Sequence, residues 1–100
     1  MTYKLTFNGD NIYLRLKGNI TVLQAKKLKQ ELFDLVGHGK YFVHIDMTQV
    51  DFIDGLALGA LVSILKRTQE YGGNVFIIKP RNFIQEIFRL TRLNEVFEIQ

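Results

Sequence analysis

The stretch FIDGLALGAL, residues 52–61, decides how the centre of this chain folds. It joins an acidic residue, Asp54, through Gly55 to a run of small and branched apolar residues. The carboxylate of Asp54 can accept hydrogen bonds from the free backbone N–H groups of Leu56 or Ala57, which is how an N-cap residue begins a helix. We therefore expect a helix to start here. The stretch contains no Ser, Thr or Cys, so the tip of this helix offers no hydroxyl or thiol.

The spacing of apolar residues predicts which side of this helix faces the core. At about 100° per residue, one face carries Leu58, Leu61, Val62, Leu65 and Gln69. The opposite face carries Leu56, Ala60, Ser63 and Arg67, with Gly59 beside them. Leu56 should project outward next to a strip with little side-chain bulk, which a partner backbone could approach closely. Scattered apolar residues are also ordinary on a surface, so periodicity alone leaves a docking surface and a surface without a partner equally open.

Upstream of this stretch, two alternating segments predict a β-hairpin. Residues 3–7 and 11–17 flank the turn-rich tetrad Asn8–Asn11, and Gly18 and Asn19 are expected to end the second strand. Within the second segment, three apolar side chains should point to one side of the sheet: Ile12, Leu14 and Leu16. The side chains between them should point to the other: Tyr13, Arg15 and Lys17.

A helix and a strand are expected between the hairpin and the central helix. Thr21 and Gln24 have the spacing of a capping box, and the residues after them recur at helical period: Ala25, Leu28, Leu32 and Leu35. Gly37 and Gly39 should stop that helix. Residues 41–47 read as a strand with Val43 and Ile45 buried, and residues 48–51 as a short link to the central helix, in which Thr48 is a turn residue.

Beyond the central helix, which should end at Gly72-Gly73, residues 75–78 are short and apolar enough for a buried strand of a parallel sheet. Asn82 is expected to cap a third helix carrying Ile84, Ile87 and Phe88, and residues 96–99 form either a short last strand or an extended tail. The order β-β-α-β-α-β-α predicts an α/β fold. Its mixed sheet combines the opening hairpin with parallel strands, and helices pack on it.

Composition limits the function. The 100 residues, 47% hydrophobic and 23% charged with a net charge of +3, predict a single domain spanning residues 1–100. The longest apolar run, Leu56–Leu65, is too short to span a membrane, and the first residues lack the pattern of a signal peptide, so we expect a cytoplasmic protein with no direct membrane insertion. The densest basic run, residues 26–29, alternates with apolar helix positions and reads as a solvated face; we expect no nucleic-acid partner.

Four segments, in order and at matching spacing, resemble the STAS domains, a family named for sulphate transporters and anti-sigma-factor antagonists. They are Gly18-Asn19-Ile20 with Ala25 and Leu28; Ile45-Asp46-Met47-Thr48-Gln49-Val50; Phe52-Ile53-Asp54 with Leu58-Gly59-Ala60-Leu61; and Gly72-Gly73 with Leu90-Thr91-Arg92-Leu93 and Phe97. The resemblance covers nearly the whole chain and implies a STAS-like fold. Arg92 stands where the family has a glycine, which puts the turn before the last segment in question.

In that family, the first serine after the aspartate is phosphorylated by a partner kinase that is also an anti-sigma factor. The unphosphorylated domain binds this kinase and frees the sigma factor, whereas phosphate breaks the complex. In this chain Gly55 occupies the serine position and Leu56 the position of the next serine. The resemblance therefore implies a binding module without phosphorylation at this position. Ser63 reads as a structural helix residue, and whether it or Thr48 is phosphorylated stays open.

The leading hypothesis is a non-catalytic module of the anti-sigma-factor-antagonist (anti-anti-sigma) type, which regulates transcription by partner switching. Asp54 would orient the helix, and the contact with a kinase-like anti-sigma factor would be made by Gly55, Leu56, Gly59 and Ala60. The alternative is an accessory subunit of a lipid-type ABC transporter, docked on the ATPase subunit. The oligomeric state is left between monomer and weak dimer.

An enzyme is the least supported reading. The carboxylates near the junction, Asp46, Asp51 and Asp54, have no His or Lys placed beside them by sequence. His38 and His44 lack the spacing of metal ligands, and Gly72-Gly73 precedes a strand rather than the helix that a phosphate loop requires. We therefore expect no catalysis, metal or cofactor.

Overall fold

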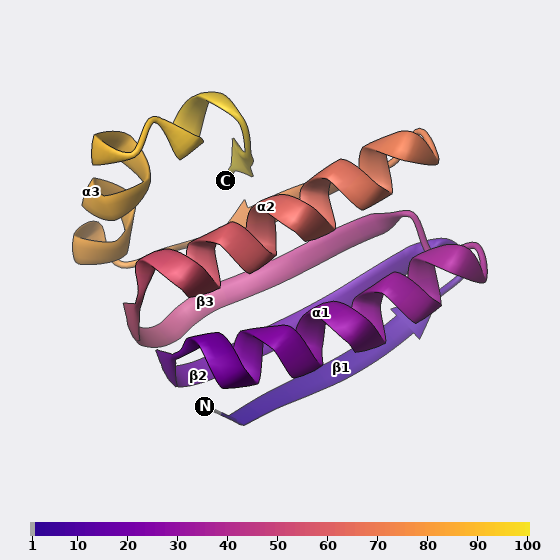
Figure 1. The fold of residues 1–100 in the computed structure, drawn as a ribbon, viewed down its shortest axis with the longest axis horizontal. Helices are drawn as coiled ribbons and strands as arrows, with labels where there is room; N and C mark the ends of the chain where they lie inside the picture. Colours follow the sequence, from indigo (N-terminus) through magenta and orange to yellow (C-terminus); the bar gives the residue numbers. More distant parts are fainter. Residues whose placement is uncertain (1) are drawn as a thin grey trace.

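The computed structural model describes residues 2–100, which form a mixed sheet with helices packed on it (Figure 1). Along the chain the elements are β1 (Thr2–Asn8), β2 (Asn11–Ile20), α1 (Val22–Gly37), β3 (Phe42–Ile53), α2 (Gly55–Glu70), β4 (Asn74–Ile78), α3 (Asn82–Leu90), a 3-10 turn η1 (Leu93–Glu95) and β5 (Glu98–Ile99). The expected order is confirmed. Residues 96–99 were expected to form either a short strand or an extended tail, and the structure contains the short strand β5.

The sheet has the order β1-β2-β3-β4-β5, so each strand lies beside its neighbour in sequence. β1 and β2 are antiparallel and joined by a two-residue turn, in which Gly9 has a φ of 59°. β2, β3, β4 and β5 are parallel, because each is connected to the next by a helical crossover. The fold is thus the predicted hairpin extended by parallel strands.

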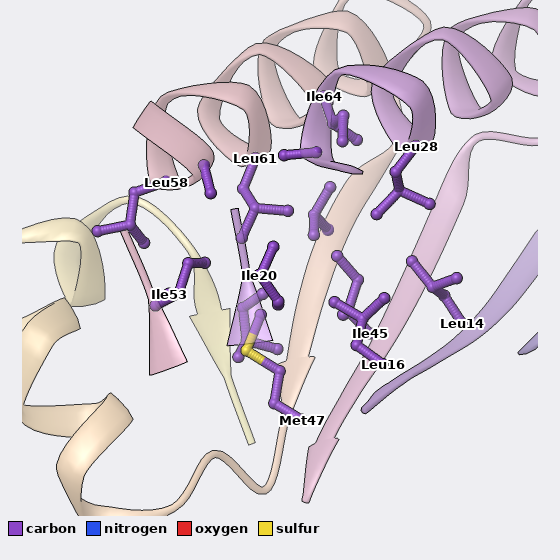
Figure 2. Packing of buried hydrophobic residues seen from close by; sticks show 14 of the residues in the cluster. Leu14, Leu16, Ile20, Leu28, Ile45, Met47, Ile53, Leu58, Leu61 and Ile64 are labelled. Carbon is purple, nitrogen blue, oxygen red and sulfur yellow. The ribbon is translucent and has the colours of Figure 1, made fainter. Parts of the chain in front are cut away.

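One face of the sheet carries the core. Figure 1 shows α1 and α2 side by side over this face, and Figure 2 shows side chains of both helices meeting those of the strands. Buried residues of α3, Ile84 and Phe88, belong to the same cluster. The alternation expected for β2 is confirmed: Ile12, Leu14 and Leu16 are buried, whereas the residues between them are exposed.

β3 is longer than expected and corrects the prediction of a link over residues 48–51. Between Arg15 and Lys17 of β2 the paired residues of β3 advance from Asp46 to Gln49, and a second shift follows between Gly18 and Asn19. Extra residues in β3 therefore bulge out, and the buried positions after Ile45 fall three apart: Met47, Val50 and Ile53. This spacing hides a strand from a search for alternation. Thr48 is accordingly a strand residue and not a turn residue.

Other boundaries differ in smaller ways. β2 runs through Gly18 and Asn19 to Ile20, because Gly18 adopts a φ of 89° within the strand rather than ending it. The N-cap of α3 is Arg81, whereas Asn82, the expected cap, is the first residue of the helix. The side chain of Arg81 makes no capping hydrogen bond. In α1 the last buried residue is Val36, whereas Leu35 is half-buried. The capping box at Thr21 is confirmed, and α1 ends at Gly37 as expected, although only Gly39 adopts the left-handed conformation, with a φ of 96°.

The buried stripe of α2 is rotated from the one expected. It consists of Ala57, Leu58, Leu61, Ile64, Leu65 and Thr68. Val62 is only half-buried and Gln69 is exposed, contrary to prediction. The reason is that α2 packs both on the sheet and against α1, so its contact face is wider than a single stripe and includes Ala57 and Ile64. This rotation still leaves Leu56 outside the core.

The start of α2 is fixed by Asp54, as predicted. Its carboxylate oxygen Oδ1 accepts a hydrogen bond from the backbone N–H of Ala57 at 2.7 Å. We expect Asp54→Ala to lower the free energy of unfolding by about 1 kcal/mol, because an orphaned helix N–H loses its acceptor. Asp54→Asn is the matched control and should retain most of the stability, since asparagine caps equally well. Urea denaturation of the three proteins measures the difference, and equal losses in both variants would contradict the capping role.

Arg92 sits in the turn between α3 and η1 with a φ of 60°, in the left-handed region. The turn is therefore formed despite the absence of glycine, with the strain that a side chain brings there. We expect Arg92→Gly to raise the free energy of unfolding by about 0.5 kcal/mol, since relief of strain exceeds the added entropy of the unfolded chain. Lys66→Gly, at an exposed position inside α2, should instead lower it by about 1 kcal/mol. A loss of stability in both variants would show that the turn is not strained.

Candidate functional site

The candidate site lies at the edge of the sheet where β2 and β3 end and the helices after them begin. The backbone N–H of Asp54 donates to the carbonyl oxygen of Ile20 at 3.3 Å, so the two chain segments meet directly before α1 and α2. Figure 1 shows these two helix starts at the same end of the molecule as α3. This is the edge at which open α/β sheets commonly bind ligands and partners.

Gly55 is the first residue of α2 and is exposed. An added Cβ at this position would meet no atom within 4 Å, and the backbone is not in the left-handed region. Neither space nor conformation requires a glycine here, so a side chain such as that of serine would fit without a clash. The helix therefore starts with a glycine because of the sequence, and the fold does not require one there.

The other residues singled out from the sequence lie together along the outer side of the first two turns of α2. Leu56 has 71% of its surface exposed, and Gly59 is exposed with open space around it. Ala60 and Asp54 are half-buried. These five residues thus lie together at the start of α2, and Leu56 is the one large apolar side chain among them.

Three exposed apolar residues that were not predicted as site residues lie in or just before the first turns of the three helices. Leu23 is 76% exposed in the first turn of α1, Phe52 is 43% exposed just before the end of β3, and Phe83 is 55% exposed in the first turn of α3. We call Leu23, Phe52, Leu56 and Phe83 the apolar rim. The sequence could have indicated them, because each is a large apolar residue next to a helix start that does not fall on the buried positions of its own helix or strand.

One ion pair lies beside the start of α3. The guanidinium of Arg81 donates to the carboxylate of Asp51 at 2.7 Å and to the carbonyl oxygen of Thr48 at 3.0 Å, which holds the start of α3 beside β3. Among the described residues, none of the three α-helices has an acidic residue in its first turn. No acidic side chain within these first turns therefore offsets the partial positive charge of the helix starts, although Asp54 caps α2 and a capping box closes the start of α1.

The two hydroxyls considered as other sites of phosphorylation are both engaged within the fold. The Ser63 hydroxyl donates to the carbonyl oxygen of Gly59 at 3.1 Å, one turn earlier in the helix, which fits the structural role expected for it. The Thr48 hydroxyl donates to the carboxylate of Asp46 at 2.7 Å. Neither hydroxyl belongs to the apolar rim.

Two groups considered for catalysis or metal binding from the sequence, Asp46 and His44, have partners within the fold. Asp46 accepts two hydrogen bonds from Thr48, and His44 Nε2 lies 2.9 Å from the side-chain oxygen of Asn11. Among residues 2–100, no group of three His, Cys, Asp or Glu side chains could hold a metal ion. Within the same residues, no helix has both the length and the apolar character needed to cross a membrane. What the site offers is an apolar contact surface.

Relatives of this chain are found among the anti-sigma-factor antagonists. The chain is 24% identical over 95 residues to an anti-sigma-B factor antagonist of Staphylococcus epidermidis, with 94% of this chain and 88% of that protein covered. It is also 24% identical to the anti-sigma-B factor antagonist of Listeria monocytogenes, with 91% and 80% covered.

Among solved structures, the unphosphorylated form of the anti-sigma factor antagonist SpoIIAA superposes with a TM-score of 0.82 at 11% identity, covering 99% of this chain and 87% of that one. The protein TM1081 superposes with a TM-score of 0.89 at 23% identity, covering 100% and 81%. These likenesses establish the fold. The family pattern described as the STAS domain matches residues 2–100, and the chain therefore belongs to the STAS domain family, within which it resembles the anti-sigma-factor antagonists.

Proposed function

We propose that this protein is a non-catalytic regulator that binds a kinase-fold anti-sigma factor through the start of α2 and the apolar rim. The observation that carries the proposal is the position of Leu56. It is 71% exposed at the tip of a helix, beside a glycine, and the starts of α1 and α3, which lie at the same end of the molecule (Figure 1), also carry exposed apolar side chains. The resemblance to anti-sigma-factor antagonists supplies the class of partner.

The energetics of the apolar rim suit such a role. Fully burying a leucine or phenylalanine side chain contributes about 1.5–3 kcal/mol, so a partner that covers several members of the rim gains enough to form a specific complex. Asp54 contributes by holding the first turn of α2 rigid through its bond to Ala57. A rigid surface loses less conformational entropy on binding than a mobile one.

We further propose that this surface is not switched by phosphorylation at residue 55. A phosphoserine at a helix start would be favoured by the free N–H groups and by the helix dipole, and its charge would repel an apolar or acidic partner. Gly55 has no oxygen to carry the phosphate. The protein is then always in the binding-competent state, and control must come from its amount or from its partner.

The direct test replaces Leu56 by aspartate and titrates the anti-sigma factors of the source organism by calorimetry. Leu56→Asp should weaken the complex by about 2 kcal/mol or more, because an unpaired carboxylate would be buried in the contact. The control is Leu90→Asp, since Leu90 is 69% exposed at the other end of α3. Equal affinity of wild type and Leu56→Asp would remove this surface from the account, as would binding only to the ATPase subunit of a transporter.

The substitution Gly55→Ser introduces a serine at the position where the family is phosphorylated. The new side chain meets no atom within 4 Å, so the fold should be unchanged. We expect the kinase partner and ATP to add one phosphate to this variant and thereby weaken its complex at least about tenfold, as read by intact mass and calorimetry. Gly59→Ser, equally free of clashes but inside the helix, should not be phosphorylated. Stoichiometric phosphate on the wild-type chain that abolishes binding would contradict the permanent state.

A further inference from the structure

The face of the sheet away from α1 and α2 is unusual for a sheet of this type. Parallel strands are almost always covered on both faces, whereas antiparallel sheets can expose one of them to water. Four of the five strands here, β2 to β5, are parallel to one another. A depression of about 360 Å³ on the uncovered face is lined by residues of strands only, including Tyr13, His44 and Ile78.

An aromatic row crosses this uncovered face. The ring centroids of Tyr13 and His44 lie 4.9 Å apart, and those of His44 and Phe76 also lie 4.9 Å apart, with the planes nearly parallel in both pairs. These residues are register partners on β2, β3 and β4. Tyr13 is 46% exposed, whereas His44 and Phe76 are half-buried, so the row is partly open to solvent.

The charges on the same face are separated by sign. The basic side chains are on β1 and β2: Lys4, Arg15 and Lys17. The acidic ones are Asp46 on β3 and Glu98 on β5, which pairs with Phe76. Arg15 Nε lies 3.4 Å from Asp46 Oδ2 within the chain. Partial burial alone would raise the pKa of Asp46, but hydrogen bonds from Thr48 and the charge of Arg15 hold that pKa below its usual value, so the carboxylate is ionised at neutral pH.

We propose that the uncovered sheet face binds a second copy of this chain. A two-fold axis along the strands, between β2 and β3, would place β2 of each copy over β3 of the other and β1 over β4. Arg15 of each copy would then lie opposite Asp46 of the other, and Tyr13 opposite His44, because these are register partners across the axis. The same surface patch serves both copies, as a closed dimer requires. The apolar rim belongs to the edge of the sheet and stays free, so the inference is independent of the proposed function.

The test uses a charge swap between two versions of the full chain. Arg15→Asp and Asp46→Arg each place like charges opposite one another in a homodimer, so sedimentation velocity should show dimer dissociation constants at least about tenfold higher than that of the wild type. An equimolar mixture of the two variants should form a heterodimer, because the carboxylates at positions 15 and 46 of one chain would face the guanidinium groups at positions 46 and 15 of the other. Lys26→Asp, a change from a basic to an acidic residue on the exposed side of α1, should leave the dissociation constant unchanged.

The mixture separates contact between chains from any effect within one chain. Restored association in the mixture, with circular dichroism unchanged in each variant, supports the dimer through this face. A wild-type protein that stays monomeric up to about 1 mM overturns the proposal. A dimer whose dissociation constant is unchanged in both variants also overturns it. The same holds if the two variants fail to associate with each other and the double variant R15D/D46R dimerises no better than the single variants.

Discussion

The hydrogen bond from the backbone N–H of Ala57 to the carboxylate of Asp54 is the interaction on which the surface of this protein depends. It begins α2 directly after β3, at the point where Asp54 also bonds to the end of β2. With the helix started there, Ala57 and Leu58 turn into the core and Gly55 and Leu56 turn to solvent. A start one residue later would rotate every following side chain by about 100° and bury a different face.

The two faces of the sheet differ in what they carry. The face under the helices holds one continuous apolar core, which supplies the hydrophobic stabilisation of the fold. The other face has an aromatic row and separated charges instead of a covering layer. The apolar rim lies at the edge between them, where side chains can be exposed without weakening the core. The surfaces proposed for partner recognition and self-association are therefore ones that the fold itself does not need.

Much of the fold follows from local patterns in the sequence. The hairpin around Gly9, the strand alternation of β2 and the caps at Thr21 and Asp54 are short-range features, set by residues a few positions apart. What could not be read locally is β3 beyond Met47, because its bulges arise from pairing with β2, far away in sequence. The rotated stripe of α2 likewise depends on contact with α1. The same limit applies to the site: the exposure of Leu56 was predictable from its own helix, whereas only the assembled fold brings the starts of α1 and α3 to the same end of the molecule as the start of α2 (Figure 1).

The central claim is that partner recognition occurs at the start of α2 without any phosphate. Backbone amide NMR spectra of the isotopically labelled protein, recorded while an anti-sigma factor is added, test it most directly. The account predicts that the largest changes fall on residues 55–60 and on the neighbouring starts of α1 and α3, in a sample whose mass shows no modification. Changes confined to the uncovered sheet face, or a dependence of binding on phosphate carried elsewhere in the chain, would contradict it.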